Sequence, residues 1–417
     1  TTAGNITYTS ASNNDSPRTL TINISDLGNT GSGGILTAST TSTINIISVN
    51  DKPTVTLGAA LAYTENAAAT VINATITLAD VDDAQLVSAT VTISSGFIAG
   101  DIFGFTDQSG IAGTYDAAIG VLSLVGSATK AQYQAALRTV TYRSTSEDPT
   151  NNNTLANRSR TISWQVTDAN SGGAGAAALT STVVTSTINL TATNDKPVVT
   201  AGGILAYTEN AAAVVIDATI AITDADDTNI TSATVTITNV VVGDVLGFTT
   251  QNGITGVYTS GTGVLALSGT ATLAQYQAAL RSVTYNSTSE DPTVNNTRNN
   301  RTITWNVTDA NSDAVGAQTS VGVTSAINLT AVYDTPVVTA GATLAYTENA
   351  AAAVIDATIT LADADDTQLA SASVTITSVV VGDVLGFTTQ NGITGVYSSG
   401  TGVLALSGTA TLAQYQA

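Results

Sequence analysis

The nonapeptide Leu-Ala-Tyr-Thr-Glu-Asn-Ala-Ala-Ala occurs three times in the chain, at residues 61–69, 205–213 and 344–352. Its tyrosines are spaced by 144 and 139 residues, and such self-similarity at a long period indicates an array of repeated domains. A second motif, in which a proline follows an aspartate by two positions, recurs in step with the first. These aspartates are Asp51, Asp195 and Asp334.

The two motifs divide the chain into four segments. Residues 51–194 and 195–333 are predicted to be complete repeats. Residues 334–417 match 195–278 and are predicted to be the N-terminal fragment of a repeat. Residues 1–50 match the sequence that follows position 278, so they are predicted to be a C-terminal fragment. The first and last segments are therefore expected to be complementary parts of one domain.

Each repeat contains short segments that are rich in valine, isoleucine and threonine, separated by glycine, asparagine and aspartate. Seven or eight such segments per repeat predict an all-β fold, with tandem antiparallel β-sandwich domains of immunoglobulin type. One segment, residues 271–282, is predicted to be a short helix, because Leu273, Tyr276 and Leu280 would share one face. Thr272 is the expected cap of this helix.

The composition excludes several classes of function. The chain has no cysteine and no histidine, which removes disulfides, thiolate metal sites and serine–histidine or cysteine–histidine nucleophiles. A formal charge of −20 disfavours nucleic acid as a partner, and no apolar run is long enough to insert into a membrane. A glycosidase with two carboxylates is the catalytic class that remains, but no pair of acids stands out. We therefore predict that the protein is not an enzyme.

The acidic residues are concentrated in five motifs. The motifs are Thr-Glu-Asn, Asp-x-Asp-Asp, Ser-Glu-Asp, Thr-Asp-Ala-Asn and the Asn-Asp pair between repeats, and they hold 23 of the 31 acids and all five glutamates. Scattered solubilising charge would not concentrate in this way. If strands alternate in direction, Thr-Glu-Asn and Ser-Glu-Asp lie at one end of a repeat, and Asp-x-Asp-Asp and Thr-Asp-Ala-Asn at the other. All five motifs then meet at each junction between repeats.

Dense oxygen ligands without nitrogen or sulfur predict Ca²⁺ as the cofactor of these junctions. The candidate ligands at the junction near Asp195 are Glu65, Glu147, Asp148, Asn194, Asp195, Asp224, Asp226 and Asp309, with Asp227 as a further possibility. Those of the other two junctions are Asn50, Asp51, Asp80, Asp82 and Asp168, and Glu209, Glu290, Asp291, Asp334, Asp363 and Asp365. Glu348 is a candidate whose partners would come from a domain after it.

Simpler interpretations of these motifs stay open. The glutamate of Thr-Glu-Asn, and likewise Ser-Glu-Asp, could be a solvated turn residue, and Asp-x-Asp-Asp could be a turn that caps backbone amides. Other residues receive structural roles: Trp164 and Trp305 are predicted core anchors. Five further aspartates are expected at the surface or in turns: Asp101, Asp217, Asp244, Asp356 and Asp383.

The motifs resemble those of the cadherin family. Thr-Glu-Asn is similar to that family's Pro-Glu-Asn, Asn-Asp-Lys-Pro to its Asn-Asp-x-x-Pro linker, and Asp224-Ala225-Asp226 to its Asp-x-Asp. Asp309 in Val-Thr-Asp-Ala-Asn corresponds to the aspartate of its Ala-x-Asp-x-Gly, without the glycine. The whole repeat is similar to the cadherin-like repeats of large bacterial surface proteins. This resemblance implies Ca²⁺ between domains and an extracellular location, at the bacterial cell surface. Tyr333 replaces the linker asparagine at the third junction, which would remove one ligand there.

Two functions follow as hypotheses. In the first, the chain is a calcium-rigidified extracellular stalk of a bacterial adhesin, which contacts neighbouring repeats head to tail and reaches an unknown receptor through other parts of the protein. In the second, the chain is the subunit of a self-assembling filament. The segment 1–50 of one copy would complete segment 334–417 of the next by strand complementation.

Overall fold

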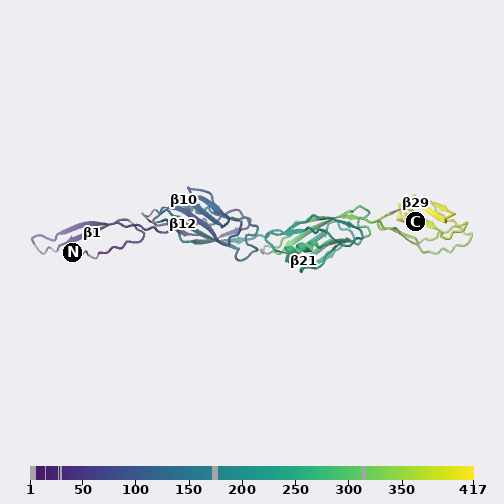
Figure 1. Ribbon diagram of the computed structural model, residues 1–417, viewed down its shortest axis with the longest axis horizontal. Coiled ribbons are helices and arrows are strands. Elements are labelled where there is room, and N and C mark those ends of the chain that lie inside the picture. Colours follow the sequence, from purple (N-terminus) through teal and green to yellow (C-terminus); the bar gives the residue numbers. More distant parts are fainter. Residues whose placement is uncertain (1–5, 15, 27, 29–30, 171–176, 312–315) are drawn as a thin grey trace. The chain divides into compact units, whose positions relative to one another are not determined.

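The computed structural model describes residues 6–14, 16–26, 28, 31–170, 177–311 and 316–417 (Figure 1). The fold is all-β, as predicted, with three short helices among the described residues. The residues form two compact units, Thr1–Asp195 with Asn311–Gly316, and Lys196–Ala310 with Ala317–Ala417. The four predicted segments are a finer division than these units, and they stay a prediction.

Residues 51–194 form three sheets. The largest has the order β4-β13-β12-β7-β10-β9, the second β5-β11-β8 and the third β3-β6. The elements are β3 (Thr54–Thr56), β4 (Leu61–Thr64), β5 (Thr70–Val71), β6 (Thr77–Ala79), β7 (Gln85–Ser95), β8 (Asp101–Gly104), β9 (Ala112–Asp116), β10 (Val121–Thr129), α1 (Lys130–Leu137), β11 (Thr141–Ser144), β12 (Ser159–Asp168) and β13 (Val184–Thr191).

Residues 195–333 repeat this topology strand for strand. Their sheets have the orders β15-β24-β23-β18-β21-β20, β16-β22-β19 and β14-β17. The elements are β14 (Val198–Thr200), β15 (Ile204–Thr208), β16 (Val214–Val215), β17 (Ala221–Thr223), β18 (Asn229–Ile237), β19 (Asp244–Gly247), β20 (Thr255–Thr259), β21 (Val264–Thr272), α2 (Leu273–Arg281), β22 (Thr284–Ser287), β23 (Asn300–Asp309) and β24 (Val323–Thr330).

The two outer segments contain subsets of this topology. Residues 1–50 contain the hairpin β1 (Arg18–Ser25) and β2 (Thr37–Ile44). Residues 334–417 contain a two-stranded sheet β25-β26 and a three-stranded sheet β27-β29-β28. The elements are β25 (Val337–Thr339), β26 (Thr360–Ala362), β27 (Gln368–Thr375), β28 (Thr394–Ser398), β29 (Val403–Thr411) and α3 (Leu412–Gln416).

One strand pair in each complete repeat departs from the predicted antiparallel arrangement. β4 pairs in parallel with β13, and β15 pairs in parallel with β24. The reason lies at the start of the repeat, where β3 pairs with β6 of one sheet and the chain continues into the other sheet without forming a hairpin. The first strand of the large sheet thereby lies alongside the last one.

The short helix occurs where the sequence predicts it. Thr272 accepts a hydrogen bond from the main-chain N–H of Gln275, whose side chain accepts one from the Thr272 N–H, so that a complete capping box starts α2. Tyr276 and Leu280 are buried on its inner face, and Leu273 packs partly buried beside them. The same cap precedes α1 and α3.

The hydrophobic core of each complete repeat forms its own cluster. Trp164 and Trp305 are fully buried in these clusters, which confirms them as core anchors. Each indole N–H donates to a buried serine hydroxyl, Ser186 and Ser325 respectively, at 2.9 Å. The ring therefore fills the core without leaving a buried donor unsatisfied.

Asp101 and Asp244 are buried, so their predicted surface positions are wrong. Each carboxylate forms an ion pair at 2.6 Å with a fully buried arginine, Arg160 or Arg301. A tyrosine hydroxyl also donates to each aspartate at 2.6 Å. The partner could not be predicted from local sequence, because the arginine lies 59 or 57 residues further along the chain, on β12 or β23.

Asp217 is also buried, although it was expected at the surface. It accepts hydrogen bonds from the main-chain N–H groups of Gly202 and Gly203, from Thr219, and from the Ser325 hydroxyl. Burial alone would raise the pKa of Asp217, but these hydrogen bonds outweigh it and lower the pKa. Asp383 is exposed, as predicted, and Asp356 is half-buried.

Candidate metal centres

Three carboxylates from separate parts of the second unit converge at the end of β15 and β24. Glu209, Glu290 and Asp334 each place an oxygen within 4.8 Å of the others. Glu209 is held here by the parallel strand pair, because its main-chain N–H donates to the Thr330 carbonyl at 2.9 Å. Its Oε2 accepts the N–H of Val332 at 2.8 Å, which orients the side chain toward the linker.

Asp365 joins this group from the following segment. Its Oδ2 accepts the main-chain N–H of Asp334 at 2.9 Å. Burial and the carboxylates of Asp334, Asp365 and Glu290 raise the pKa of Glu209. Burial, with Asp365, Glu290 and Asp363 nearby, likewise raises the pKa of Asp334. The ionised carboxylates of this group therefore repel one another.

Three other oxygens of this group lack hydrogen-bond partners among the described residues. They are Oε1 of Glu209, Oδ2 of Asp334 and Oδ1 of Asp365, and all three are buried. A buried carboxylate oxygen without a partner carries a large desolvation cost. A cation among these oxygens would remove both the repulsion and this cost.

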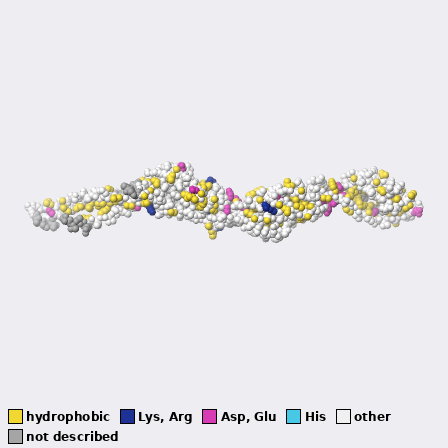
Figure 2. Space-filling view, viewed as in Figure 1, with side chains coloured by type: hydrophobic (Ala, Val, Ile, Leu, Met, Phe, Trp, Pro, Cys, Tyr) yellow, Lys and Arg dark blue, Asp and Glu magenta, His cyan; other side chains and the backbone are white. Residues whose placement is uncertain are grey.

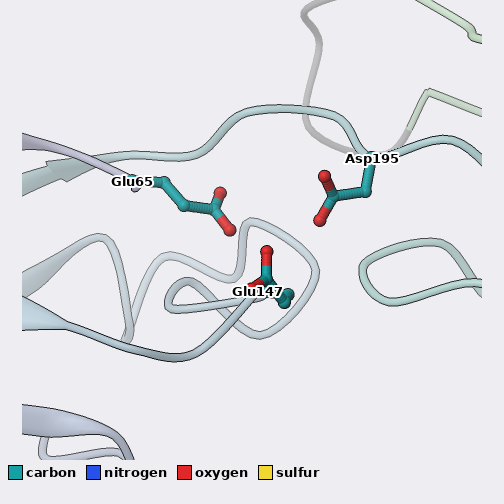
Figure 3. A group of neighbouring side chains, drawn as sticks. All are labelled: Glu65, Glu147 and Asp195. Carbon is teal, nitrogen blue, oxygen red and sulfur yellow. The ribbon is translucent and has the colours of Figure 1, made fainter. Parts of the chain in front are cut away.

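The corresponding residues of the first unit have the same arrangement. Glu65, Glu147 and Asp195 each place an oxygen within 4.8 Å of the others, and Figure 3 shows their carboxylates pointing toward one another. Glu65 is buried and accepts hydrogen bonds from the Thr193 N–H at 2.8 Å and the Thr193 hydroxyl at 3.2 Å. Asn66 donates to Glu147 at 3.5 Å, so that Thr-Glu-Asn and Ser-Glu-Asp lie at the same end of the repeat.

The Asp-x-Asp-Asp motifs form a second kind of acidic group. In two of the three copies, three carboxylates lie within 4.8 Å of one another: Asp80, Asp82 and Asp83 in the first unit, and Asp224, Asp226 and Asp227 in the second. Burial and contact with Asp226 raise the pKa of Asp224 to about 7. The turn-capping interpretation also holds in part. One oxygen of each leading aspartate accepts two main-chain N–H groups, while its other oxygen, on Asp80 or Asp224, has no partner among the described residues.

The Asn-Asp linker contacts the end of the repeat that follows it. Asp51 donates its main-chain N–H to Oδ2 of Asp82 at 2.9 Å, and Asn50 donates its amide to Asp168 at 3.0 Å. Asn50 Oδ1 and Asp82 Oδ1 are buried without a partner among the described residues. The structure thus brings Asn50, Asp82 and Asp168 together at one end of the repeat, with Asp51 bonded to them through its backbone.

The aspartates of Thr-Asp-Ala-Asn stabilise a loop as well as facing the linker. Asp168 accepts the Leu179 N–H at 2.9 Å, and Asp309 accepts the Gln318 N–H at 2.9 Å. Both aspartates are fully buried at the ends of β12 and β23. Asn194 donates to the Gly316 carbonyl at 2.8 Å, as Asn50 does to the Ala177 carbonyl.

Several predicted ligands lie outside the acidic groups. Asp148 and Asp291 accept main-chain N–H groups from the asparagine-rich turns that follow them, at 2.9 and 2.7 Å, which is a structural role. Asp363 accepts the N–H groups of Asp365 and Asp366, and it also lies near enough to Asp334 to help raise the pKa of that residue. Glu348 is exposed and lies in none of the acidic groups of the described residues.

Asp83 belongs to these groups but was not predicted as a ligand, and Asp227 was predicted only as a further possibility. Both are buried beside the leading aspartates. The repeated motif could have indicated both residues. All three copies end in Asp-Asp, and an aspartate that is only solvated needs no fixed neighbour. Tyr333, which replaces the linker asparagine, is 90 % exposed.

The donor set fits a hard cation of high coordination number. All the side-chain donors are oxygens, most of them carboxylate, and Ca²⁺ takes six to eight such ligands in flexible geometry. Mg²⁺ demands stricter octahedral geometry and retains its waters. Glu209, Glu290, Asp334 and Asp365 would hold the ion in the second unit, and Glu65, Glu147 and Asp195 in the first.

Comparison with known proteins gives structural neighbours only. No protein-family model matches the chain, and no curated protein matches it in sequence. Among solved structures, the chain is similar to cadherin domains 1–4 of protocadherin gamma B7 at 12 % identity, covering 90 % of this chain and 72 % of that one with a TM-score of 0.27. It is also similar to mouse protocadherin-24 domains 1–3 at 14 % identity, with coverages of 75 % and 80 % and a TM-score of 0.27. Drosophila N-cadherin domains 1–4 give 14 % identity, coverages of 76 % and 59 % and a TM-score of 0.21. Values this low support no argument about function.

No helix among the described residues is long and apolar enough to cross a membrane.

Proposed function

We propose that this chain is a calcium-rigidified spacer in the extracellular stalk of a bacterial surface adhesin. The observation that carries the proposal is the set of buried, unpartnered carboxylate oxygens on Glu209, Asp334 and Asp365. Residues on both sides of the linker contribute to this set, so an ion bound there would fix one segment against the next. The chain has no histidine and no cysteine, so neither residue can serve as a nucleophile or a general base.

The mechanism is electrostatic. Without a cation, carboxylates within 4.8 Å repel one another, and the linker between the segments is the part that can change conformation. With Ca²⁺, the same oxygens become ligands and the linker angle is fixed. Extracellular calcium modules bind at roughly 10⁻⁴ to 10⁻³ M, so the stalk would be rigid outside a cell and flexible in chelator.

Small-angle X-ray scattering tests this function. We expect the maximum dimension of the chain to fall, and its flexibility to rise, when Ca²⁺ is replaced by EDTA. Glu209→Gln with Asp334→Asn should weaken the response, whereas Glu348→Gln, which changes the same motif outside any acidic group, should leave it intact. Identical profiles with Ca²⁺ and with EDTA would contradict the proposal.

A further inference from the structure

The two glutamates of the candidate site in the second unit are carried by different sheets. Glu209 follows β15 of the six-stranded sheet, whereas Glu290 follows β22, the central strand of a three-stranded sheet. β15 and β22 are neighbours in no sheet of the described residues, so strand pairing does not set the separation of the two carboxylates. A contact between a side chain and the backbone sets it instead.

The hydroxyl of Tyr207 forms this contact. Tyr207 lies on β15, two residues before Glu209, and is 1 % exposed. Its hydroxyl donates to the Ala211 carbonyl at 2.7 Å and accepts the main-chain N–H of Ser287 at 3.1 Å. Ala211 ends the turn that contains Glu209, and Ser287 ends β22, three residues before Glu290. One oxygen therefore ties the Thr-Glu-Asn turn to the start of the Ser-Glu-Asp loop.

The ring of Tyr207 is held independently of its hydroxyl. It packs edge-on against Tyr285 of β22, with the ring centroids 5.0 Å apart and an angle of 85° between the ring planes. It also belongs to the hydrophobic core of the repeat. A phenylalanine at this position would keep the ring contact and lose only the two hydrogen bonds of the hydroxyl.

The Ser-Glu-Asp loop is held at both of its ends. At its start, Ser287 Oγ accepts the Ser289 N–H at 3.2 Å. At its end, the buried Arg301 donates to the Pro292 carbonyl at 2.6 Å. Glu290 is therefore carried by a loop whose ends are fixed, and the Tyr207 hydroxyl connects that loop to the Thr-Glu-Asn turn.

A second link between the turn and the loop is longer. Asn210 donates its side-chain amide to Glu290 Oε2 at 3.5 Å, between two exposed residues, which is the limit of a hydrogen bond. This bond also occupies a carboxylate oxygen that a cation would need. The hydrogen bonds of Tyr207 are shorter and use only backbone groups, so they can hold the turn and the loop together with or without a bound cation.

The first repeat contains the same link. Tyr63 is 1 % exposed, and its hydroxyl donates to the Ala67 carbonyl at 2.7 Å and accepts the Ser144 N–H at 3.2 Å. Figure 3 shows Glu65 and Glu147 on separate stretches of the chain, with their carboxylates close together. The tyrosine of the repeated nonapeptide thus joins the two glutamate-bearing segments in both complete repeats.

The link opposes the repulsion between the carboxylates. On the face shown in Figure 2, acidic side chains occur in a few small groups. Within the group described here, burial and the neighbouring carboxylates, Glu290 among them, raise the pKa of Glu209. A hydroxyl that holds the backbones together keeps the carboxylates close before a cation arrives, so binding does not first have to bring them together.

We propose that Tyr207 is a positioning residue of the cation site. Its hydroxyl holds the segments of Glu209 and Glu290 together so that both carboxylates bind one ion. Tyr63 has the same role in the first repeat. This inference rests on the proposed function, because it concerns the same site.

Calorimetric titration of the full chain with Ca²⁺ tests the role of the hydroxyl. Glu209→Gln with Asp334→Asn first identifies the binding component that belongs to this site. In Tyr207→Phe, which retains every ligand, we expect the dissociation constant of that component to rise about tenfold. Tyr276→Phe is the matched control, since its buried hydroxyl donates to the Gly269 carbonyl at 2.6 Å in the same repeat, and it should leave the dissociation constant unchanged.

Thermal unfolding in EDTA separates positioning from a purely structural role. Both tyrosine variants lose a buried hydrogen bond, so both should have a lower midpoint, but only Tyr207→Phe should also weaken Ca²⁺ binding. Unchanged binding by Tyr207→Phe would overturn the positioning role and leave the cation site standing. If Glu209→Gln with Asp334→Asn removes no binding component, the proposed function fails as well.

The first repeat provides an independent measurement should Tyr207→Phe fail to fold. There, Glu65→Gln with Asp195→Asn identifies the binding component, and Tyr63→Phe should raise its dissociation constant by a similar factor. An unchanged constant in that variant would equally overturn the positioning role.

Discussion

The buried charges show most directly how single residues determine this fold. Asp101 and Asp244 are removed from water together with an arginine each, and the guanidinium groups also donate to main-chain carbonyls of Pro149 and Pro292. Those prolines follow the Ser-Glu-Asp motif, so Arg160 ties the loop that carries Glu147 to the core. A pair of this kind costs desolvation and depends on both partners being present.

Removing one partner of a buried Asp–Arg ion pair should strongly destabilise the repeat that contains it. We expect Asp244→Ala to lower the free energy of unfolding of the second repeat by about 3–5 kcal/mol, because Arg301 would retain an uncompensated buried charge. Urea unfolding followed by tryptophan fluorescence, in a Trp164→Phe background so that only Trp305 reports, measures this change. Asp383→Ala is the matched control, since Asp383 forms no ion pair among the described residues, and a comparable loss there would contradict the explanation.

The pKa of Asp217 predicts a dependence of stability on acid. Because its hydrogen bonds lower the folded-state pKa below the ordinary value of 3.8, the unfolded chain binds the proton more readily. The contribution of Asp217 is therefore complete above that value and is lost as the pH falls through the folded-state pKa. Asp217→Asn should remove this acid-sensitive component in urea titrations between pH 5 and pH 2.

The first repeat supplies the justification for that substitution. Asn73 occupies the equivalent position, and its Oδ1 accepts hydrogen bonds from Gly58 and Thr75 as Asp217 accepts them from Gly202 and Thr219. The fold therefore accommodates asparagine here, although the buried Nδ2 of Asn73 has no hydrogen-bond partner among the described residues. A variant that unfolds with unchanged acid sensitivity would show that Asp217 is not the responsible group.

The acidic groups were predictable from residue positions only in outline. Five motifs in consistent order were enough to predict that Glu65 and Glu147 share one end of a repeat, because strand direction follows from counting strands. The roles of Asp148 and Asp291 could not be predicted in that way. Each accepts a main-chain N–H from a turn with three successive residues at positive φ, Asn151–Asn153 after Asp148 and Val294–Asn296 after Asp291, and that local geometry has no unique sequence pattern.

At the scale of elements, the helix shows what local sequence can decide. The cap at Thr272 and the apolar face could be predicted because both depend on residues within about two helical turns of each other. The parallel pairing of β15 with β24 was not, since it joins strands more than 100 residues apart and no local pattern records it. The same limit applies to the buried Asp–Arg pairs.

We expect Thr272→Ala to lower the free energy of unfolding of the second repeat by about 1 kcal/mol, the usual cost of a lost helix cap. The capping box would lose its hydroxyl acceptor for the Gln275 N–H. Thr272→Ser retains that oxygen and should be close to neutral. Thermal unfolding of the two variants side by side measures the difference, and equal midpoints would contradict the role of the cap.

At the scale of the whole molecule, cation binding should contribute directly to stability. An ion that binds the folded state with a dissociation constant of about 10⁻⁴ to 10⁻³ M adds roughly 1.4 to 2.7 kcal/mol per site at about 10 mM Ca²⁺. We expect calorimetry to show a rise in midpoint with Ca²⁺ and a smaller one with equal Mg²⁺. Glu209→Gln with Asp334→Asn should reduce the rise, and Glu348→Gln should not.

The parallel pairing of first and last strands has a mechanical consequence. Within residues 51–194, β4 lies near the start and β13 at the end, and both run in the same direction. Tension on the two ends of the repeat pulls β4 toward its amino end and β13 toward its carboxyl end, in opposite directions along one axis. The hydrogen bonds between them are then loaded in shear, all at once, rather than opened one after another. A repeat built in this way resists stretching along the chain more strongly than one whose terminal strands form an antiparallel hairpin.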